Sequence, residues 1–179
     1  MTHRYIALLR GINLGRAKRI AMSDLRALVE ALGYLDVRTL LNSGNVVFSS
    51  RRAVPADAAA RIEAALVAAV GVSSRITLLS SEDLAQIVRE NPLHDVATNH
   101  SRLHVAVLTN PVDRAKLEPL LAEAWAPEAL ALGTRVAYLW CPDGMTGSRL
   151  PEAVGAAVEP AVTTRNWATM MKLHALACS

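Results

Sequence analysis

The sequence has few cysteines, few aromatic residues and no long hydrophobic run. Among its 179 residues, Cys141 and Cys178 lie far apart and in no motif, which excludes a disulfide framework or a zinc site and predicts free thiols. One phenylalanine is present and hydrophobic residues make up 52%, so the core must be built mainly from Ala, Val, Leu and Ile. No apolar run approaches the roughly 18 residues of a membrane span. Residues 1–4 lead directly into a strand-like run instead of a signal-peptide core, so we expect a cytoplasmic protein.

The charged residues are unevenly distributed along the chain. Residues 1–52 contain nine Lys or Arg and three acids, a net charge of +6, whereas residues 53–179 contain ten and thirteen, a net charge of −3. This asymmetry indicates that the first part of the chain meets an anionic partner, either a phosphate-bearing ligand or a nucleic acid. A basic face exposed to solvent, with no partner, is the alternative interpretation.

The hydrophobic pattern of the first half predicts a β-α-β-β-α-β order of elements. Short apolar runs predict strands, and apolar residues at helical spacing predict helices. The expected elements are a strand over 4–10, a helix over 22–32, a hairpin of strands 37–41 and 46–48, a helix from Pro55 to Gly71, and a strand over 75–79. The first strand is nearly continuously apolar, which predicts burial on both faces. This order is that of a ferredoxin-like sandwich, with both helices on one face of a four-stranded sheet.

The second half repeats the same order after a connecting helix. Ser80 and Asp83 are typical of a helix start, and Asn91-Pro92 ends that helix. The elements expected next are a strand over 103–108, a helix from Pro111 with an apolar face of Leu117, Leu120 and Leu121, strands over 129–132 and 136–140, a helix near 150–158, a strand over 161–164 and a terminal helix from Asn166. We therefore predict an α+β fold of two ferredoxin-like (βαββαβ) sandwiches in tandem, with lobes 1–80 and 99–179 joined by a connecting helix in 81–98.

Several segments together carry a family resemblance. They are Ala7-Leu8-Leu9-Arg10-Gly11-Ile12-Asn13-Leu14-Gly15, Ser43-Gly44-Asn45-Val46-Val47-Phe48, Tyr138-Leu139-Trp140-Cys141-Pro142-Asp143-Gly144 and Thr163-Thr164-Arg165-Asn166-Trp167. In these segments the chain resembles the bacterial domain of unknown function 1697 family, whose members open with an LLRGINVGG-like segment and close with a TTRNWxT-like one. The resemblance implies two α+β lobes and brings no activity with it. The chain departs from the family pattern at Arg16, where a second glycine is usual, and at Ala21, where proline is common.

The loop from Arg10 to Ile20 is the first candidate site. A strand ends there, Gly11 and Gly15 bracket Asn13, and a helix begins shortly afterwards. Backbone amides freed by glycine, together with a helix N-terminus, suit the binding of an anion. The cations that would reinforce binding are Arg10, Arg16, Lys18 and Arg19. In the alternative interpretation the glycines serve the backbone and Asn13 organises the loop.

The segment around Arg165 is the second candidate site. The guanidinium of Arg165 offers a planar fork for carboxylate or phosphate, and Asn166 is a natural helix N-cap. The predicted ligand-binding residues are therefore Arg10, Asn13, Lys18, Arg19, Arg165 and Asn166. We expect no cofactor, and the spacing of His94, His100 and His104 matches no metal site.

These residues favour a non-catalytic binding protein for an anionic ligand that carries phosphate, or for a nucleic acid. One alternative is an enzyme that acts on a small phosphorylated or acidic substrate, for which Asp143 and Ser148 are the nearest polar candidates. Another is a protein-interaction module with no small ligand. The sequence leaves open both catalysis and the oligomeric state.

Overall fold

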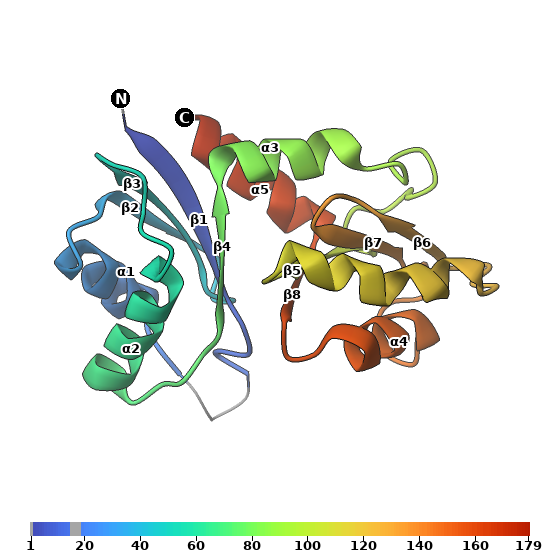
Figure 1. The fold of residues 1–179 in the computed structure, drawn as a ribbon, viewed down its shortest axis with the longest axis horizontal. Helices are drawn as coiled ribbons and strands as arrows, with labels where there is room; N and C mark the ends of the chain where they lie inside the picture. Colours follow the sequence, from blue (N-terminus) through green and yellow to red (C-terminus); the bar gives the residue numbers. More distant parts are fainter. Residues whose placement is uncertain (1, 15–18) are drawn as a thin grey trace. The chain divides into compact units, whose positions relative to one another are not determined.

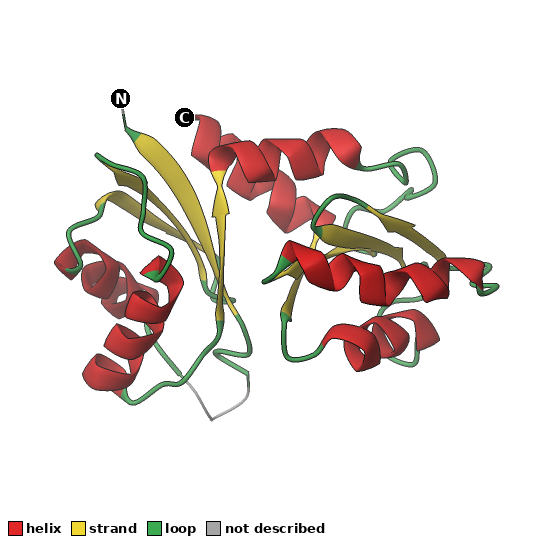
Figure 2. Ribbon diagram, viewed as in Figure 1, coloured by secondary structure: helices red, strands yellow, loops and turns green. Residues whose placement is uncertain are grey.

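The computed structural model describes residues 2–14 and 19–179, so Gly15, Arg16 and Lys18 lie outside the described residues. The chain divides into two units, a first made of Met1–Asp83 and Leu173–Ser179 and a second made of Leu84–Lys172. Each unit contains one four-stranded antiparallel sheet with helices, as the ribbon shows (Figures 1 and 2). The protein is therefore of the mixed α+β class, as predicted.

The first unit has its elements in the order strand, helix, strand, strand, helix, strand. They are β1 (His3–Leu9), α1 (Met22–Ala31), β2 (Leu35–Leu40), β3 (Asn45–Ser50), α2 (Ala58–Val70) and β4 (Ile76–Ser80). The spatial order of the strands is β2-β3-β1-β4, and every neighbouring pair is antiparallel. β1 is therefore central, with β3 on one side and β4 on the other.

The helices α1 and α2 lie on one face of this sheet (Figure 1). Leu25 and Val29 of α1 and Ile62 of α2 pack in one core with strand residues that include Leu9 and Phe48. The core is mainly aliphatic, as the single phenylalanine predicts. Residues Ile6, Ala7, Leu8 and Leu9 are all 0% exposed, which confirms that both faces of the first strand are buried.

The second unit repeats this order of elements and of strands. Its elements are β5 (Leu103–Leu108), the helix η1 (Pro111–Ala122), β6 (Ala129–Leu132), β7 (Val136–Trp140), α4 (Arg149–Val158) and β8 (Val162–Asn166). The strands follow the order β6-β7-β5-β8. Leu117 of η1 and Leu150 and Val154 of α4 form one core with Ala106 and Leu139 of the sheet.

The helix predicted from Pro111 is a 3₁₀-helix along its whole length. Pro119 lies inside it and lacks a backbone N–H, and in an α-helix its ring would clash with the carbonyl of Ala115, so the tighter winding is favoured. A 3₁₀-helix aligns residues three apart. Leu117 and Leu120 accordingly face the core, whereas Leu121 is 49% exposed. The prediction that Leu121 belongs to the apolar face was therefore wrong.

Two further helices follow the strands β4 and β8. They are α3 (Ser81–Glu90) and α5 (Trp167–Cys178). Ser80 and Asp83 form the predicted start of α3, because the Ser80 N–H donates to Asp83 Oδ2 at 2.8 Å and the Asp83 N–H donates to Ser80 Oγ at 3.0 Å. α3 ends at Glu90, directly before the Asn91-Pro92 that was predicted to end this helix, and the rest of the connecting segment 81–98 follows it. The last residues of α5 group with the first unit. That lobes 1–80 and 99–179 are independent domains stays a prediction.

In the first unit α1 begins at Met22, as predicted, whereas α2 begins three residues later than the predicted Pro55. The N-cap of α1 is Ala21, which has no side-chain acceptor, and Ser23 lies inside the first turn. The N-cap of α2 is Asp57, so Pro55 precedes the helix, where its carbonyl oxygen accepts from the Ala58 N–H at 3.0 Å. A proline near a helix start fixes the approach of the chain without defining the first helical residue.

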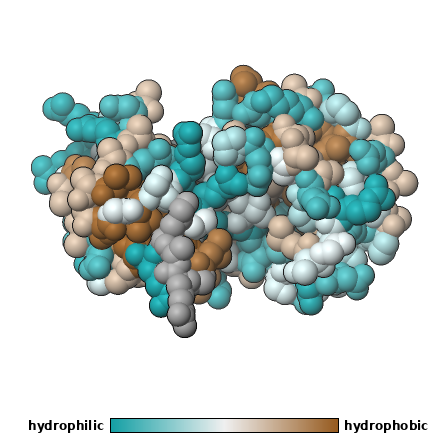
Figure 3. Space-filling model, turned by 90° about the horizontal axis from the view of Figure 1, so that it is seen from below, coloured by the Kyte–Doolittle hydropathy of each residue, from teal (hydrophilic) through white to brown (hydrophobic). Residues whose placement is uncertain are grey.

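The surface of the described residues shows neither a membrane span nor a metal cluster. Within 2–14 and 19–179, every helix is too short or too polar to cross a bilayer. Nor do three or more His, Cys, Asp or Glu side chains gather there to hold a metal ion. Figure 3 shows hydrophobic side chains among hydrophilic ones on the face of the molecule that it presents.

Candidate functional site

The predicted site residues fall in both units. Arg10, Asn13 and Arg19 lie in the first unit, in or beside the connection from β1 to α1. Arg165 and Asn166 lie in the second unit, at the end of β8. Lys18 is outside the described residues. The hypothesis that these residues form one common site therefore stays a prediction.

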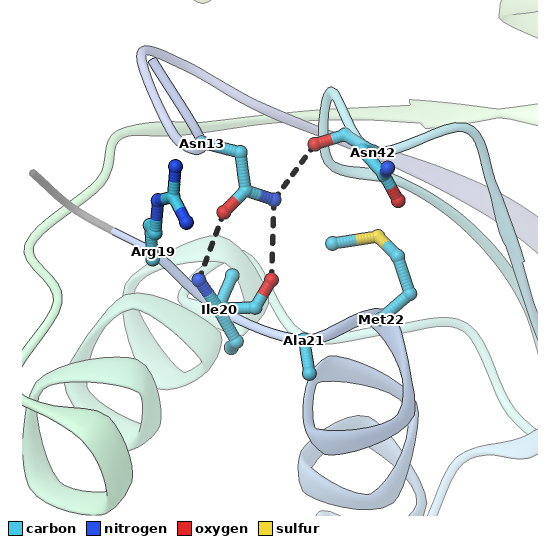
Figure 4. A pocket seen from close by; sticks show the side chains of 6 residues that line it. All are labelled: Asn13, Arg19, Ile20, Ala21, Met22 and Asn42. Atoms are coloured by element: carbon cyan, nitrogen blue, oxygen red, sulfur yellow. Dashed lines mark hydrogen bonds between the residues drawn. The ribbon is translucent and has the colours of Figure 1, made fainter. Parts of the chain in front are cut away.

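Asn13 organises the connection between β1 and α1 (Figure 4). Its Nδ2 donates to the carbonyl oxygens of Ile20 at 3.1 Å and Asn42 at 2.8 Å, and its Oδ1 accepts from the Ile20 N–H at 2.9 Å. Its backbone adopts the left-handed region with φ +55°, which asparagine tolerates better than most residues. Three hydrogen bonds to backbone groups favour the alternative weighed from the sequence, in which Asn13 holds the loop in place.

A hollow of about 430 Å³ lies beside Asn13. We call it the loop hollow, and its lining residues are Asn13, Arg19, Ile20, Ala21, Met22 and Asn42. In Figure 4 the guanidinium of Arg19 lies on the Asn13 side of the hollow and the thioether of Met22 reaches across it. Arg19 is exposed, so the loop hollow brings one cation to the surface near the start of α1.

A second pocket, of about 350 Å³, lies where β1 ends and β4 begins. We call it the strand-end pocket, and its lining residues are Arg10, Gly11, Ser73, Ser74 and Arg75. The antiparallel register of β1 and β4 pairs Leu9 with Ile76. The next residues along the chains, Arg10 and Arg75, therefore stand opposite each other, and the Arg10 N–H donates to the Arg75 carbonyl oxygen at 2.9 Å.

Short hydrogen bonds hold the backbone of the strand-end pocket. Ser74 is buried and its hydroxyl donates to the carbonyl oxygen of Arg10 at 2.8 Å, so it closes the turn onto the end of β1. Gly11 has φ +65°, a conformation that favours glycine. Ser73 and Arg75 are exposed and Arg10 is partly buried. Hydrogen bonds therefore fix the backbone that carries Arg10 and Arg75.

The strand-end pocket is electropositive. Among the residues that the structure describes around it, the five that line it include two arginines and no acid. The carboxylate that reaches this strand end belongs to Glu63 of α2, whose Oε1 accepts from the Ile76 N–H at 2.7 Å. Like charges at directly opposed positions are unfavourable, so the pocket is suited to an anion that would lie between the arginines.

Sequence reasoning found Arg10 and missed Ser73, Ser74 and Arg75. Arg75 was predicted as the first residue of the strand over 75–79, Ser73 and Ser74 were given no element, and a Ser-Ser-Arg segment has no specific signature. The missing information was the register of β1 against β4, which brings residue 75 opposite residue 10.

In the second unit, Arg165 and Asn166 have separate roles. Arg165 stands opposite Val105 in β8, and its Nη1 donates to the Thr164 carbonyl oxygen at 3.0 Å. Burial lowers the pKa of Arg165 to about 10, so the side chain keeps its charge at neutral pH. Asn166 Oδ1 accepts from the Thr169 N–H at 2.9 Å, which confirms the predicted N-cap of α5.

Two other cavities are lined by groups that support the fold. In one, of about 460 Å³, Arg4 donates to the carbonyl oxygens of Leu176 at 3.4 Å and Ala177 at 3.2 Å, close to the end of α5. In the other, of about 500 Å³, Glu90 accepts from the N–H and the hydroxyl of Thr134. Burial opposes ionisation of Glu90, but hydrogen bonds from Thr134 and Gln86 outweigh it, and its pKa is lowered. These contacts fasten the β6–β7 turn to α3.

The geometry defines an α+β protein with two antiparallel sheets and an arginine-lined pocket at one strand end. Its family is shown by a family model that matches residues 1–138: the chain belongs to the family described as "Protein of unknown function (DUF1697)". A solved structure, described as "The structure of conserved bacterial protein SP0830 from Streptococcus pneumoniae", resembles the chain with a TM-score of 0.80 over 99% of each chain. At 22% sequence identity this likeness concerns the fold alone. No curated protein matches the chain.

Proposed function

We propose that this protein is a non-catalytic binding protein for an anionic ligand that carries phosphate, and that the ligand binds in the strand-end pocket. The observation that supports the proposal is the opposition of Arg10 and Arg75 across the backbone hydrogen bond of 2.9 Å, in a pocket with Ser73 and Ser74. Guanidinium groups bind phosphate through paired N–H donors, and a hydroxyl adds one more.

The second unit provides an internal comparison for this arrangement. There the Thr109 N–H donates to the Ala161 carbonyl oxygen, also at 2.9 Å, at the matching end of β5 and β8. The same backbone geometry thus occurs in both units, and in the second it carries two uncharged residues. The fold does not require arginine at this place. The paired arginines of the first unit are therefore better explained by binding than by folding.

The residues predicted from the sequence have different places in this proposal. Arg10 lines the strand-end pocket, and Arg19 lines the loop hollow on the same connection between β1 and α1. Asn13 holds that connection through its three backbone hydrogen bonds. Asn166 caps α5, and a role of Arg165 in binding stays a hypothesis to be tested by substitution.

The composition of the pocket favours binding over catalysis. Within the described residues, the groups that line it are guanidiniums, hydroxyls and a glycine, which stabilise negative charge and lack a general base. Of the polar candidates for the enzyme alternative, Ser148 Oγ accepts from the Leu150 N–H at 3.3 Å and caps α4. Asp143 is exposed in the turn after β7. Neither belongs to the strand-end pocket.

Binding of inorganic phosphate, measured by isothermal titration calorimetry at low ionic strength, tests the proposal. Arg75→Ala removes an exposed guanidinium, so we expect the fold to persist and the affinity to fall by at least about tenfold, the loss of one charge-assisted hydrogen bond. Arg52→Ala is the matched control, because Arg52 is also exposed in the first unit and its removal changes the net charge equally. Equal losses in both variants would mean that phosphate binds to general positive charge, and the proposal would be wrong.

We propose that each unit is a ferredoxin-like sandwich, supported by the order of elements and by the strand orders β2-β3-β1-β4 and β6-β7-β5-β8. The cytoplasmic location expected from the sequence is part of the same proposal, and cell fractionation tests it.

A further inference from the structure

The two cations of the strand-end pocket come from opposed positions on neighbouring chain segments, Arg10 after β1 and Arg75 before β4. Residues directly opposed on antiparallel strands have Cβ atoms about 4.5–5.5 Å apart, a separation that one phosphate group can bridge. The backbone of a nucleic acid is held differently, by a row of cations or a groove that follows successive phosphates. Arg10 and Arg75 form no such row, since they face each other across a single hydrogen-bonded position.

The pocket also has the dimensions of a site for one small group. Its volume of about 350 Å³ lies near the lower end of the range of about 300–1,000 Å³ found for small-molecule sites. Ser74 lines it and is buried, and its hydroxyl donates to the Arg10 carbonyl oxygen. The side-chain donors that line it are the guanidiniums of Arg10 and Arg75 and the hydroxyls of Ser73 and Ser74. This set matches a group with three terminal oxygens better than a diester with two.

The charge of the pocket favours a doubly charged ligand. Its lining residues carry two positive charges, while a phosphate monoester carries about −1.5 to −2 at neutral pH and a diester carries a single charge. Among the described residues, the titratable groups at the site include Arg10 at the end of β1, Arg75 before β4 and Glu63 on α2. The negative charge of Glu63 repels an anion weakly, and its Oε1 accepts a hydrogen bond from the Ile76 N–H.

We infer that the strand-end pocket selects a phosphate monoester, the terminal phosphate of a small molecule, over the phosphodiester of a nucleic acid. This inference rests on the proposed function and names the ligand class for the same site. The opposition of Arg10 and Arg75 across one hydrogen-bonded position and the two positive charges of the lining carry it.

Calorimetric titration with phenyl phosphate and with methyl phenyl phosphate tests the inference. The two probes share the phenyl ring, but the first is a phosphate monoester and the second is a diester. We expect the monoester to bind at least about tenfold more tightly, since one charge-assisted hydrogen bond distinguishes the two. A single-stranded oligonucleotide with hydroxyl groups at both ends serves as the nucleic-acid probe. Each probe is measured with the wild type, Arg75→Ala and the control Arg52→Ala.

The pH dependence gives a second readout. Lowering the pH from about 7.5 to about 5 protonates a phosphate monoester, whose second pKa is near 6, and leaves about one tenth of it doubly charged. The affinity for phenyl phosphate should therefore fall about tenfold. Inorganic sulfate keeps its two charges over this range, so its affinity should stay constant and report on the protein groups alone.

The outcomes separate the inference from the proposed function. Tighter binding of the monoester, lost in Arg75→Ala and kept in Arg52→Ala, supports both. If the diester or the oligonucleotide binds as tightly as the monoester and depends on Arg75, the inference is wrong and the proposed function stands. If no phosphate probe binds, or if both variants lose affinity equally, both are wrong.

Discussion

The buried hydroxyl of Tyr138 lets one substitution test the core of the second unit. Tyr138 lies on the strand β7, is 0% exposed and donates to the carbonyl oxygen of Ile87 in α3 at 2.6 Å. Tyr138→Phe keeps the ring and leaves that carbonyl with one partner fewer. A hydrogen bond of this kind contributes about 1 kcal/mol, and an unsatisfied buried group adds to the loss. We expect the free energy of unfolding of the second unit to fall by about 1–2 kcal/mol at neutral pH.

The pH dependence of this difference follows from the ionisation of the same group. Burial raises the pKa of Tyr138 above its ordinary value of 10.0, and the negative charge of Glu90 adds to the effect. Between the ordinary pKa and the raised pKa, the hydroxyl has lost its proton in the unfolded chain and keeps it in the folded chain. The unfolded state therefore binds fewer protons, and the free energy of unfolding falls as the pH rises. Ionisation of this one group lowers the free energy of unfolding of the wild type by about 0.4 kcal/mol at pH 10 and by about 1.4 kcal/mol at pH 11. Tyr138→Phe has no hydroxyl to ionise, so the difference in free energy of unfolding between the wild type and this variant should shrink to near zero by about pH 11.

Urea unfolding followed by tryptophan fluorescence measures the effect in the right unit. The three tryptophans, Trp125, Trp140 and Trp167, all lie within Leu84–Lys172. Tyr5→Phe is the control, because Tyr5 belongs to the first unit and its hydroxyl accepts from the Val54 N–H, so this variant should leave the fluorescence transition unchanged. A difference between wild type and Tyr138→Phe that stays constant up to about pH 11 would refute the reasoning. The hydroxyl would then ionise equally in the folded and unfolded states.

Three other predictions concern single side chains. A Cβ at Gly44, with φ +77°, would lie 2.6 Å from Ile12 Cδ1, so Gly44→Ala should destabilise the first unit by about 2–4 kcal/mol in urea unfolding followed by circular dichroism. Gly71→Ala, at φ +66° with open space around the Cβ, should cost only about 1–2 kcal/mol, and equal losses would contradict the steric argument. Asn166→Ala removes the cap of α5 and should cost about 1 kcal/mol of stability with phosphate affinity intact; a loss of affinity would instead support the binding role predicted from the sequence. Glu63→Gln keeps an acceptor for the Ile76 N–H and removes a negative charge beside the strand-end pocket, so phosphate should bind up to about fivefold more tightly, and unchanged binding in calorimetry would place Glu63 outside the field of the site.

Elements fixed by local chemistry were predicted well. The strands over 103–108, 129–132 and 136–140 have the predicted bounds, because apolar runs between turn residues specify a strand without knowledge of the rest of the chain. The capping of α3 by Ser80 and Asp83 and of α5 by Asn166 is confirmed for the same reason, since donor and acceptor lie three residues apart.

Predictions that depended on the kind of helix were weaker. The apolar residues of 111–122 repeat at spacings that fit either an α-helix or a 3₁₀-helix over one turn. Pro119 favours the second, and the spacing of Leu117, Leu120 and Leu121 then places one leucine outside the core. The presence of a proline inside an expected helix was a signal that could have corrected this prediction.

The candidate site required information that local pattern does not contain. Gly11 and Arg10 stand out in the sequence, but a cation next to a glycine is common, and charge alone gives no reason to connect residue 10 with residue 75. Antiparallel pairing of β1 with β4 makes that connection, because the pair Leu9 and Ile76 fixes the position of every residue beyond it. A shift of β4 by one residue would place Ser74 or Ile76 opposite Arg10 and would separate the two guanidiniums. The register is held by the burial of Leu9, Ile76 and Leu79, so the hydrophobic core of the first unit also sets the distance between the charges on which the proposed phosphate site depends.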